Sequence, residues 1–153
     1  MAKVRMEGEW KVWAATGAIV VAIVGYLYFV SRPPTEEGKP LWKVEKVVDG
    51  KTVTLRGSGK TIQFRLIGLI IPASEEKATQ EFLTQNLLNK WIRIEVKREG
   101  PDKVAEGMIF LDSEDILARL IRQGLAKVDR DEQGFDVRLY IELEQEAKRQ
   151  QKG

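Results

Sequence analysis

Two hydrophobic patterns divide the chain near residue 32. The first is an uninterrupted run of twenty uncharged residues, 12–31, bounded by Lys11 and Arg32. As an α-helix, a run of this length matches the hydrocarbon thickness of a bilayer. A buried helix of a soluble protein is rarely apolar on every face over such a length. The pattern therefore predicts a transmembrane helix over residues 12–31, after a short tail of residues 1–11.

The ends of this run carry the aromatic residues that are typical of membrane interfaces: Trp10 and Trp13 at one end, and Tyr26, Tyr28 and Phe29 at the other. A cleaved signal peptide is the alternative. The run is longer than the usual apolar region of a signal, and no A-x-A-like site precedes Arg32. We therefore expect a retained single-pass anchor, with an orientation that the flanking charges leave open.

The second pattern begins after a Pro- and Gly-containing segment, residues 32–40, which we interpret as a linker without secondary structure. Strand-like alternation follows at residues 41–48, 52–55 and 61–66, separated by Asp49-Gly50 and Gly57-Ser58-Gly59 turns. Ile92, Ile94 and Val96 indicate a fourth strand, and residues 108–111 a fifth. Four aromatic residues are expected in the core: Trp42, Phe64, Trp91 and Phe110.

Helical spacing recurs in three segments. The first is residues 75–88, with Ser74 as the expected N-cap. The second runs from a cap at Asp112 or Ser113 through Ile121 and ends at Gly124. The third is residues 137–151, where Leu139, Leu143 and Ala147 form an i, i+4 row. Five short strands with one helix interposed are the element order of an oligonucleotide/oligosaccharide-binding (OB) barrel, so we predict an α+β fold over residues 41–153.

Three segments resemble the staphylococcal nuclease (thermonuclease) family: VVDGKTVTL at 47–55, FRLIGLIIP at 64–72 and RQGLAKV at 122–128. They follow the family's order and approximate spacing, and the resemblance covers about residues 42–150. It implies the same OB barrel. In active members it also implies a Ca²⁺ held by carboxylates and backbone, a Glu that acts on the attacking water, and two Arg side chains that hold the scissile phosphate.

The metal-binding motifs depart from the family pattern. The motif Asp-Gly-Asp-Thr reads Asp49-Gly50-Lys51-Thr52 here, so Lys51 replaces a metal-binding Asp. In the second motif, Arg-Leu-x-Gly-x-Asp-x-Pro-Glu, Ile70 replaces the other metal-binding Asp and Ala73 replaces the Glu. An ammonium group at Lys51 would repel a calcium ion, so the resemblance implies a lost metal site.

One of the family's two phosphate-binding positions is changed in this chain. Arg65 matches the first arginine, whereas Glu106 stands approximately where a Tyr-Gly-Arg motif supplies the second. Removing one electrostatic stabiliser typically costs about 10²–10³ in rate, so we expect an inactive nuclease homologue. Arg65 either pairs with Asp49, Glu106 or another carboxylate, or keeps an anion-binding role. Lys51 either pairs with Asp49 near the vacated ion position or is a solvated turn lysine.

The amino-acid composition limits the kinds of site that the chain can form. The chain has neither Cys nor His, which excludes disulfides and removes the commonest general base and transition-metal ligand. Residues 35–153 hold 21 basic and 21 acidic side chains, whereas a polyanion-binding domain normally shows a basic excess. We expect no cofactor, metal or small-molecule substrate, and the balance disfavours nucleic acid.

These observations favour a non-catalytic, single-pass membrane protein whose nuclease-like domain is a structural or protein-binding module. Its expected partners are the lipid bilayer and the other subunits of a larger membrane complex, to which it would belong as an accessory subunit. A mitochondrial respiratory-type complex, and hence the mitochondrial inner membrane, is the specific expectation. The alternatives are a membrane-tethered nucleic-acid-binding domain and an active membrane-anchored nuclease.

Overall fold

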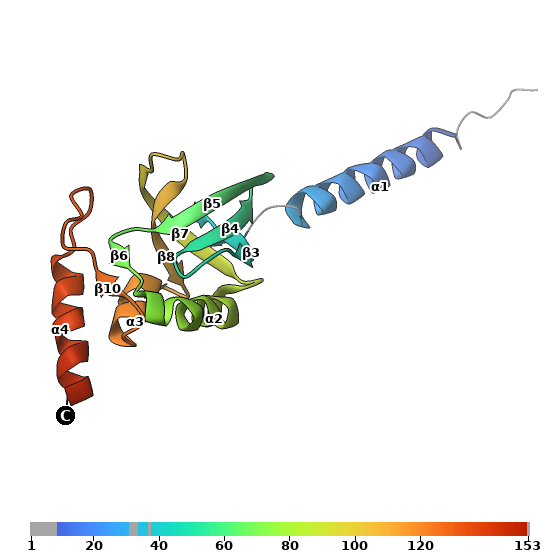
Figure 1. The fold of residues 1–153 in the computed structure, drawn as a ribbon. Helices are drawn as coiled ribbons and strands as arrows, with labels where there is room; N and C mark the ends of the chain where they lie inside the picture. Colours follow the sequence, from blue (N-terminus) through green and yellow to red (C-terminus); the bar gives the residue numbers. More distant parts are fainter. Residues whose placement is uncertain (1–8, 31–33, 37, 153) are drawn as a thin grey trace, which may run out of the picture. The chain divides into compact units, whose positions relative to one another are not determined.

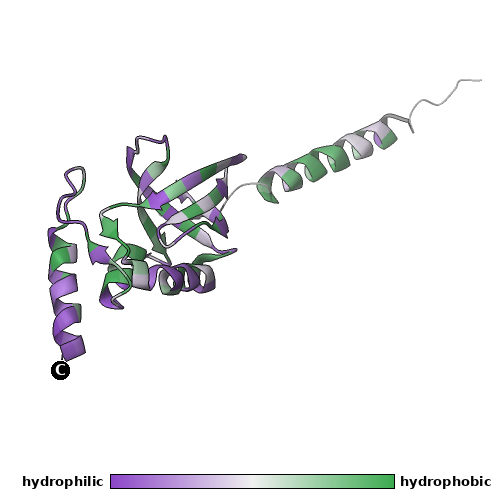
Figure 2. Cartoon of the chain, in the orientation of Figure 1, coloured by the Kyte–Doolittle hydropathy of each residue, from purple (hydrophilic) through white to green (hydrophobic). Residues whose placement is uncertain are grey.

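The computed structural model describes residues 9–30, 34–36 and 38–152 (Figure 1). The chain forms two compact units, residues 1–32 and 33–153. In the first unit, α1 (Glu9–Val30) begins three residues before the predicted span, and Ser31 lies outside the described residues. Every side chain from Lys11 to Val30 is exposed, and the helix is hydrophobic along most of its length (Figure 2). Lys11–Val30 is long and apolar enough to span a membrane.

The second unit opens with a small hairpin inside the segment predicted to be a linker. β1 (Thr35–Glu36) pairs antiparallel with β2 (Lys39–Pro40). The Leu41 N–H donates to the Pro34 carbonyl at 2.8 Å, and the Ser113 hydroxyl donates to the Glu36 carboxylate at 2.9 Å. The expected absence of secondary structure therefore does not hold for these residues, because the hairpin finds backbone and side-chain partners in its own unit.

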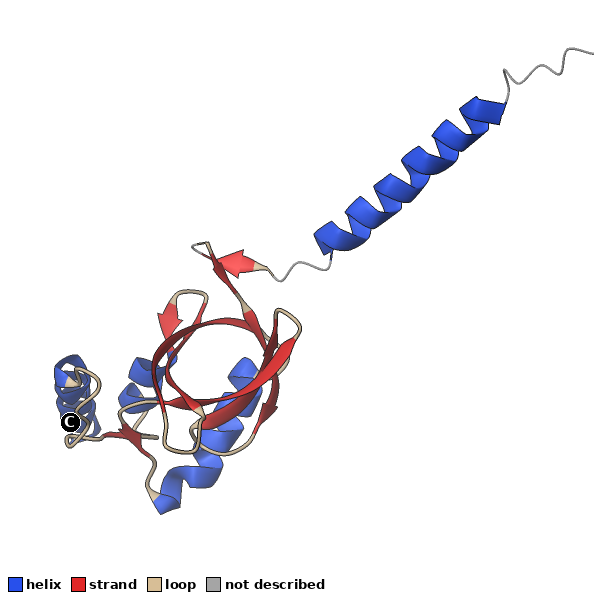
Figure 3. Cartoon of the chain, turned by 90° about the horizontal axis from the view of Figure 1, so that it is seen from above, coloured by secondary structure: helices blue, strands red, loops and turns tan. Residues whose placement is uncertain are grey.

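The five predicted strands form a closed barrel, seen end-on in Figure 3. Neighbouring strands are antiparallel, and a parallel pairing between the third and the fifth closes the ring. The α+β barrel predicted from the sequence is confirmed. Its strands are β3 (Trp42–Val47), β4 (Thr52–Gly57), β5 (Lys60–Leu66), β7 (Trp91–Glu99) and β8 (Ala105–Leu111).

The barrel interior is filled by alternate residues of these strands, as period-two patterning requires. Val44, Leu55, Phe64, Ile92 and Ile109 have no exposed surface. Trp91 is the exception to the expected aromatic core: its side chain is 42% exposed on the outer face of the barrel. Trp42 and Phe110 are only partly buried against the core. Strand alternation explains this difference, because Trp91 precedes the inward-facing Ile92.

Three helices pack around the barrel. Their bounds are α2 (Glu76–Leu87), α3 (Ile116–Arg122) and α4 (Arg138–Lys152). Short strands join the connections: β6 (Leu69–Ile70) pairs with β10 (Lys127–Val128), and β9 (Glu114–Asp115) extends the barrel sheet beside β8. As predicted, Gly124 follows α3 with a positive φ of 73°.

Both predicted helix N-caps are wrong. Ser74 lies within a 3-10 turn, Ala73–Glu75, and α2 has no side-chain cap. Asp112 and Ser113 form the tight β8–β9 turn with positive φ angles, so Asp115 caps α3 instead through the N–H groups of Leu117 and Ala118. The sequence analysis named only Asp112 and Ser113, because it did not anticipate the short strand β9 that moves the helix start to Asp115.

The buried side of α4 also differs from the predicted row. Tyr140, Glu144 and Ala147 are buried, whereas Leu139 is 60% exposed. The Tyr140 hydroxyl donates to Asp115 at 2.6 Å. The Glu144 carboxylate accepts the Val128 N–H at 3.1 Å. Polar contacts to β9 and β10 therefore set the rotation of this helix.

Candidate functional site

Two of the positions implied by the motifs, Arg65 and Glu106, lie along the seam that closes the barrel. Thr52 of β4 pairs with Arg65 of β5, and Arg65 pairs with Glu106 of β8. Arg98 of β7 lies opposite Glu106 on its other side. Directly opposed residues project to the same face of a sheet, so these four residues form one row across four strands. We call it the seam row.

An ionic network occupies the seam row. The Arg65 Nη1 donates to Glu106 Oε1 at 3.1 Å, and its Nη2 donates to Asp102 Oδ2 at 2.8 Å. The Arg98 Nε donates to Glu106 Oε2 at 2.6 Å, and its two Nη atoms contact both oxygens of Glu132. The Glu106 side chain is only 8% exposed. A nearly buried carboxylate is thus bound by two guanidinium groups, one on each side.

The pKa directions agree with this pairing. The hydrogen bond with Asp102, followed by that with Glu106, raises the pKa of Arg65 despite partial desolvation. Contacts with Glu106 and Glu132 raise the pKa of Arg98. The Arg65 guanidinium in turn lowers the pKa of the Asp102 carboxyl. Of the two readings of Arg65, pairing with carboxylates is confirmed, and Glu106 is one of the partners named in advance.

A second set of contacts fixes the turn between β3 and β4. Asp49 Oδ1 accepts the backbone N–H groups of Lys51 and Thr52 at 2.9 and 2.8 Å. The Gly50 N–H donates to Glu76 Oε1 of α2 at 2.7 Å. Among the described residues, no ion pair joins the Lys51 ammonium to Asp49, so the hypothesis of such a pair is wrong. Asp49 is instead used by the backbone of its own turn.

The remaining motif positions supply no ligand for a hard cation. Ile70 of β6 is 50% exposed, and Ala73 lies exposed in the 3-10 turn. Calcium requires several oxygen ligands, which neither side chain provides. In the part of the chain that the structure describes, no three or more acidic, His or Cys side chains gather closely enough to hold a metal ion. The residues present therefore do not fit the calcium ion that the resemblance implies.

Four residues of these networks were missed by the sequence reasoning: Glu76, Arg98, Asp102 and Glu132. A signal existed for one pair. Arg98 and Glu106 flank the Gly100-Pro101-Asp102 turn at a spacing that brings opposite charges across a hairpin. Glu76 and Glu132 gave no such signal, because their contacts depend on how α2 and the segment before α4 pack on the barrel.

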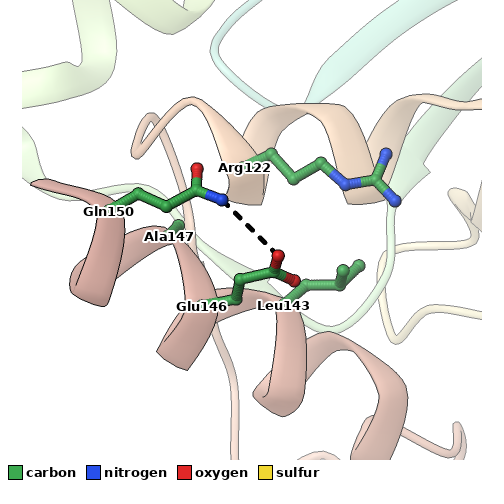
Figure 4. Close-up of a pocket in the computed structure, with 5 residues that line it drawn as sticks. All are labelled: Arg122, Leu143, Glu146, Ala147 and Gln150. Atoms are coloured by element: carbon green, nitrogen blue, oxygen red, sulfur yellow. Dashed lines mark hydrogen bonds between the residues drawn. The ribbon is translucent and has the colours of Figure 1, made fainter.

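A separate shallow pocket of about 220 Å³ lies between α3 and α4. It is lined by Arg122, Leu143, Glu146, Ala147 and Gln150 (Figure 4). The Gln150 amide turns toward the Glu146 carboxylate, with a long contact of 3.5 Å. No residue of the seam row or of the β3–β4 turn lines this pocket, so it is not part of the motif-derived site.

Comparison with known proteins gives two similar sequences, while no family model matches the chain. A thermonuclease of Staphylococcus intermedius is 28% identical over 149 residues, which cover 88% of this chain and 89% of the relative. A thermonuclease of Staphylococcus hyicus is 24% identical over 125 residues, covering 72% of this chain and 74% of the relative. Both similarities extend over most of the chain, well beyond the three motif segments.

Proposed function

Because the chain carries a staphylococcal-nuclease-like domain, we propose that this domain has lost the nuclease reaction and acts as a structural or protein-binding module. The single observation that carries the proposal is Glu106. It engages Arg65 and Arg98 at once, and the resemblance puts it approximately at the position of the second phosphate-binding arginine. A phosphate approaching this row would meet a carboxylate and two guanidinium groups that already have anionic partners.

The positions that correspond to the family's metal-binding motifs support the same conclusion. Lys51, Ile70 and Ala73 remove oxygen ligands, and Glu76 Oε1 accepts the Gly50 N–H. Hydrogen bonds to Glu76 and Asp49 close the β3–β4 turn. We expect such a domain to keep its shape without calcium, which suits a role in which the fold itself is the functional part.

We further propose that α1 is a single membrane anchor and that the domain serves as an accessory subunit of a larger membrane complex. The exposed, apolar α1 supports the anchor, and the half-exposed Ile70, at a position where the motif has an acid, suits a protein contact. Membership of a mitochondrial respiratory-type complex and location in the mitochondrial inner membrane stay predictions of the sequence reasoning.

An activity assay tests the loss of catalysis. The full chain in mild detergent is incubated with labelled single- and double-stranded DNA and with RNA, with and without millimolar Ca²⁺. We expect no digestion above the buffer control. Arg65→Ala is the matched control for contamination. Calcium-dependent digestion by the unaltered chain that Arg65→Ala abolishes would contradict the proposal.

Purification in mild detergent tests the assembly role. We expect the chain to elute with other membrane subunits in a stoichiometric complex that survives a second purification step. A defined variant, Ile70→Asp, should weaken that association if the apolar surface is used. A chain that elutes alone as a monomer would count against an accessory subunit while leaving the loss of catalysis untouched.

One observation favours the alternative of nucleic-acid binding. Trp91 is exposed and lies beside Lys43 on the neighbouring strand, and single-stranded nucleic acid binds where aromatic side chains and cations alternate. The even charge balance of residues 35–153 opposes it. A binding assay with labelled single-stranded DNA at low salt decides between this alternative and the proposed function. If this surface binds the DNA, Trp91→Ala should lose that binding.

A further inference from the structure

A row of basic and aromatic side chains crosses the outer face of the barrel, away from the seam row. Lys43 of β3 lies directly opposite Arg56 of β4 on one side and Trp91 of β7 on the other. One residue further along each strand, Val44, Leu55 and Ile92 are fully buried. Strand alternation therefore places Arg56, Lys43 and Trp91 together on the outward face.

Charge on this face is predominantly positive. Lys46 lies opposite Thr54 on the same outward side, and both Lys46 and Arg56 are exposed. Glu45 is the acid nearby, and it pairs with Arg56 at 3.1 Å, with side-chain exposures of 34% and 67%. A surface pair of this kind is weak and remains open to other partners. We call Lys43, Lys46, Arg56 and Trp91 the basic face.

The combination matches the chemistry of an anionic bilayer surface. Lysine and arginine side chains are attracted to anionic lipid headgroups, and Trp is enriched at the membrane–water interface, where its ring is half apolar and half polar. An exposed Trp among cations satisfies both requirements. A protein-binding surface would normally carry fewer lysines, since lysine is depleted from interface cores.

The chain length supplies an independent argument. Only four residues, 31–34, separate the end of α1 at Val30 from β1 at Thr35. Four extended residues span at most about 14 Å. If α1 crosses a membrane, the second unit cannot diffuse far from the headgroups, so even weak attraction would be effective.

We propose that the basic face binds anionic phospholipid headgroups directly, as a second membrane contact in addition to α1. The contact is electrostatic and interfacial, and it involves no residue of the seam row. Each basic side chain near such a surface contributes about fivefold in affinity, so losing three should weaken binding by about a hundredfold if all act in full, and by at least about tenfold if they act in part. Lipid binding by the basic face is independent of the proposed loss of catalysis and of the proposed subunit assembly.

A fragment of residues 33–153 makes the test direct, because it lacks the anchor. Every buried hydrophobic side chain of the described residues lies between Val44 and Ala147, so the fragment contains the complete core. Co-sedimentation is measured with phosphatidylcholine vesicles with and without phosphatidylserine, at increasing salt. We expect binding only when phosphatidylserine is present, with a steady decrease as salt screens the charges.

Four variants identify the surface. Lys43→Ser with Lys46→Ser and Arg56→Ser should lose at least about tenfold in binding, and Trp91→Ala should lose fluorescence quenching by brominated lipid. Glu45→Gln, which removes the acid, should strengthen binding. The control removes three exposed cations elsewhere, Arg122→Ser with Arg149→Ser and Lys152→Ser, and should change binding less than twofold.

Three results would overturn the proposal. The first is equal binding to vesicles without phosphatidylserine. The second is an equal loss in the control variant, which would mean a net-charge effect without a defined face. The third is tight binding of single-stranded DNA through Trp91 with no vesicle binding, which would assign this face to nucleic acid. Cooperative thermal unfolding of each variant confirms that any loss of binding is not a loss of folding.

Discussion

At the scale of single residues, Glu106 connects the two strands on either side of its own. The backbone pairing that presents Arg65 beside residue 106 is intact. The carboxylate at residue 106 pairs with Arg65 on one side and with Arg98 on the other. Glu106 therefore forms a cross-strand connection at the barrel seam.

Replacing Glu106 with Gln tests that connection. The amide keeps the shape of the side chain but loses the charge that two guanidinium groups share. Hydrogen bonds to charged groups contribute about 1.5–3 kcal/mol, so we expect the free energy of unfolding to fall by about 2 kcal/mol. Urea denaturation of the 33–153 fragment measures it. Glu99→Gln, on an exposed position of β7, is the control, and an equal effect in both variants would contradict the assigned role.

Tyr140 gives a pH-dependent prediction. Burial first, and then the hydrogen bond to Asp115, raise the pKa of its hydroxyl above the ordinary value of about 10. The folded state therefore keeps this proton when the unfolded state has lost it. The resulting stability is present below pH about 10 and is lost as pH rises further. Tyr140→Phe should flatten that alkaline decrease in the free energy of unfolding, and an unchanged slope would contradict the argument.

The sequence predicted the candidate site in part, and the reason is physical. Asp49, Lys51, Arg65 and Glu106 could be placed because local motifs fix their strands and turns. The residues that contact them could not be placed in the same way. Glu76 reaches Gly50 from a helix, and Glu132 reaches Arg98 from the loop before α4. Such contacts depend on packing between elements, which a hydrophobic pattern does not encode.

At the scale of elements, the five barrel strands were recovered from the sequence, and buried residues alternate with more exposed ones most clearly in β4 and β5. The rotation of the last helix about its axis was not recovered. In α4 the expected apolar row included Leu139, yet the buried face carries Glu144. Burial alone would raise the pKa of Glu144, but the Val128 N–H, Lys148 and Arg130 together hold the pKa below its ordinary value. A buried acid is rare without such partners, so sequence patterning assigns it to the surface.

The close pairing of β7 with β8 leads to a prediction at Gly107. A Cβ at this position would lie 1.9 Å from the Glu95 carbonyl oxygen, a distance that backbone atoms cannot accommodate. Gly107→Ala should therefore separate β7 from β8 and prevent cooperative folding of the 33–153 fragment, as measured by circular dichroism. Gly59→Ala is the control, because nothing lies within 4 Å of a Cβ there and only its positive φ opposes the change. A stable Gly107→Ala variant would mean that β7 and β8 are not paired as described.

At the scale of the whole molecule, the likeness to known proteins covers almost the entire domain. The similarity to the thermonuclease of Staphylococcus intermedius extends over 88% of the chain, and the chain forms a closed five-stranded barrel with helices packed around it. Four positions differ from the residues of the family's motifs: Lys51, Ile70, Ala73 and Glu106. Internal contacts lie beside two of them, from the Gly50 N–H to Glu76 at the turn and from Arg98 to Glu106 at the seam. Under the proposed loss of catalysis, we expect the domain to be stable by itself.

Calcium provides the whole-molecule test of that expectation. A ligand stabilises a protein only if it binds the folded state more tightly than the unfolded state. With Lys51 in the β3–β4 turn and no oxygen ligand from Ile70 or Ala73, the folded domain offers calcium no such preference. The thermal unfolding midpoint of the full chain should therefore stay constant as Ca²⁺ rises into the millimolar range. Lys51→Asp combined with Ile70→Asp and Ala73→Glu is the matched comparison, because it returns the oxygen ligands and should make the midpoint rise with Ca²⁺. A rise in the unaltered chain would mean that a cation site survives, and that the internal contacts have not replaced it.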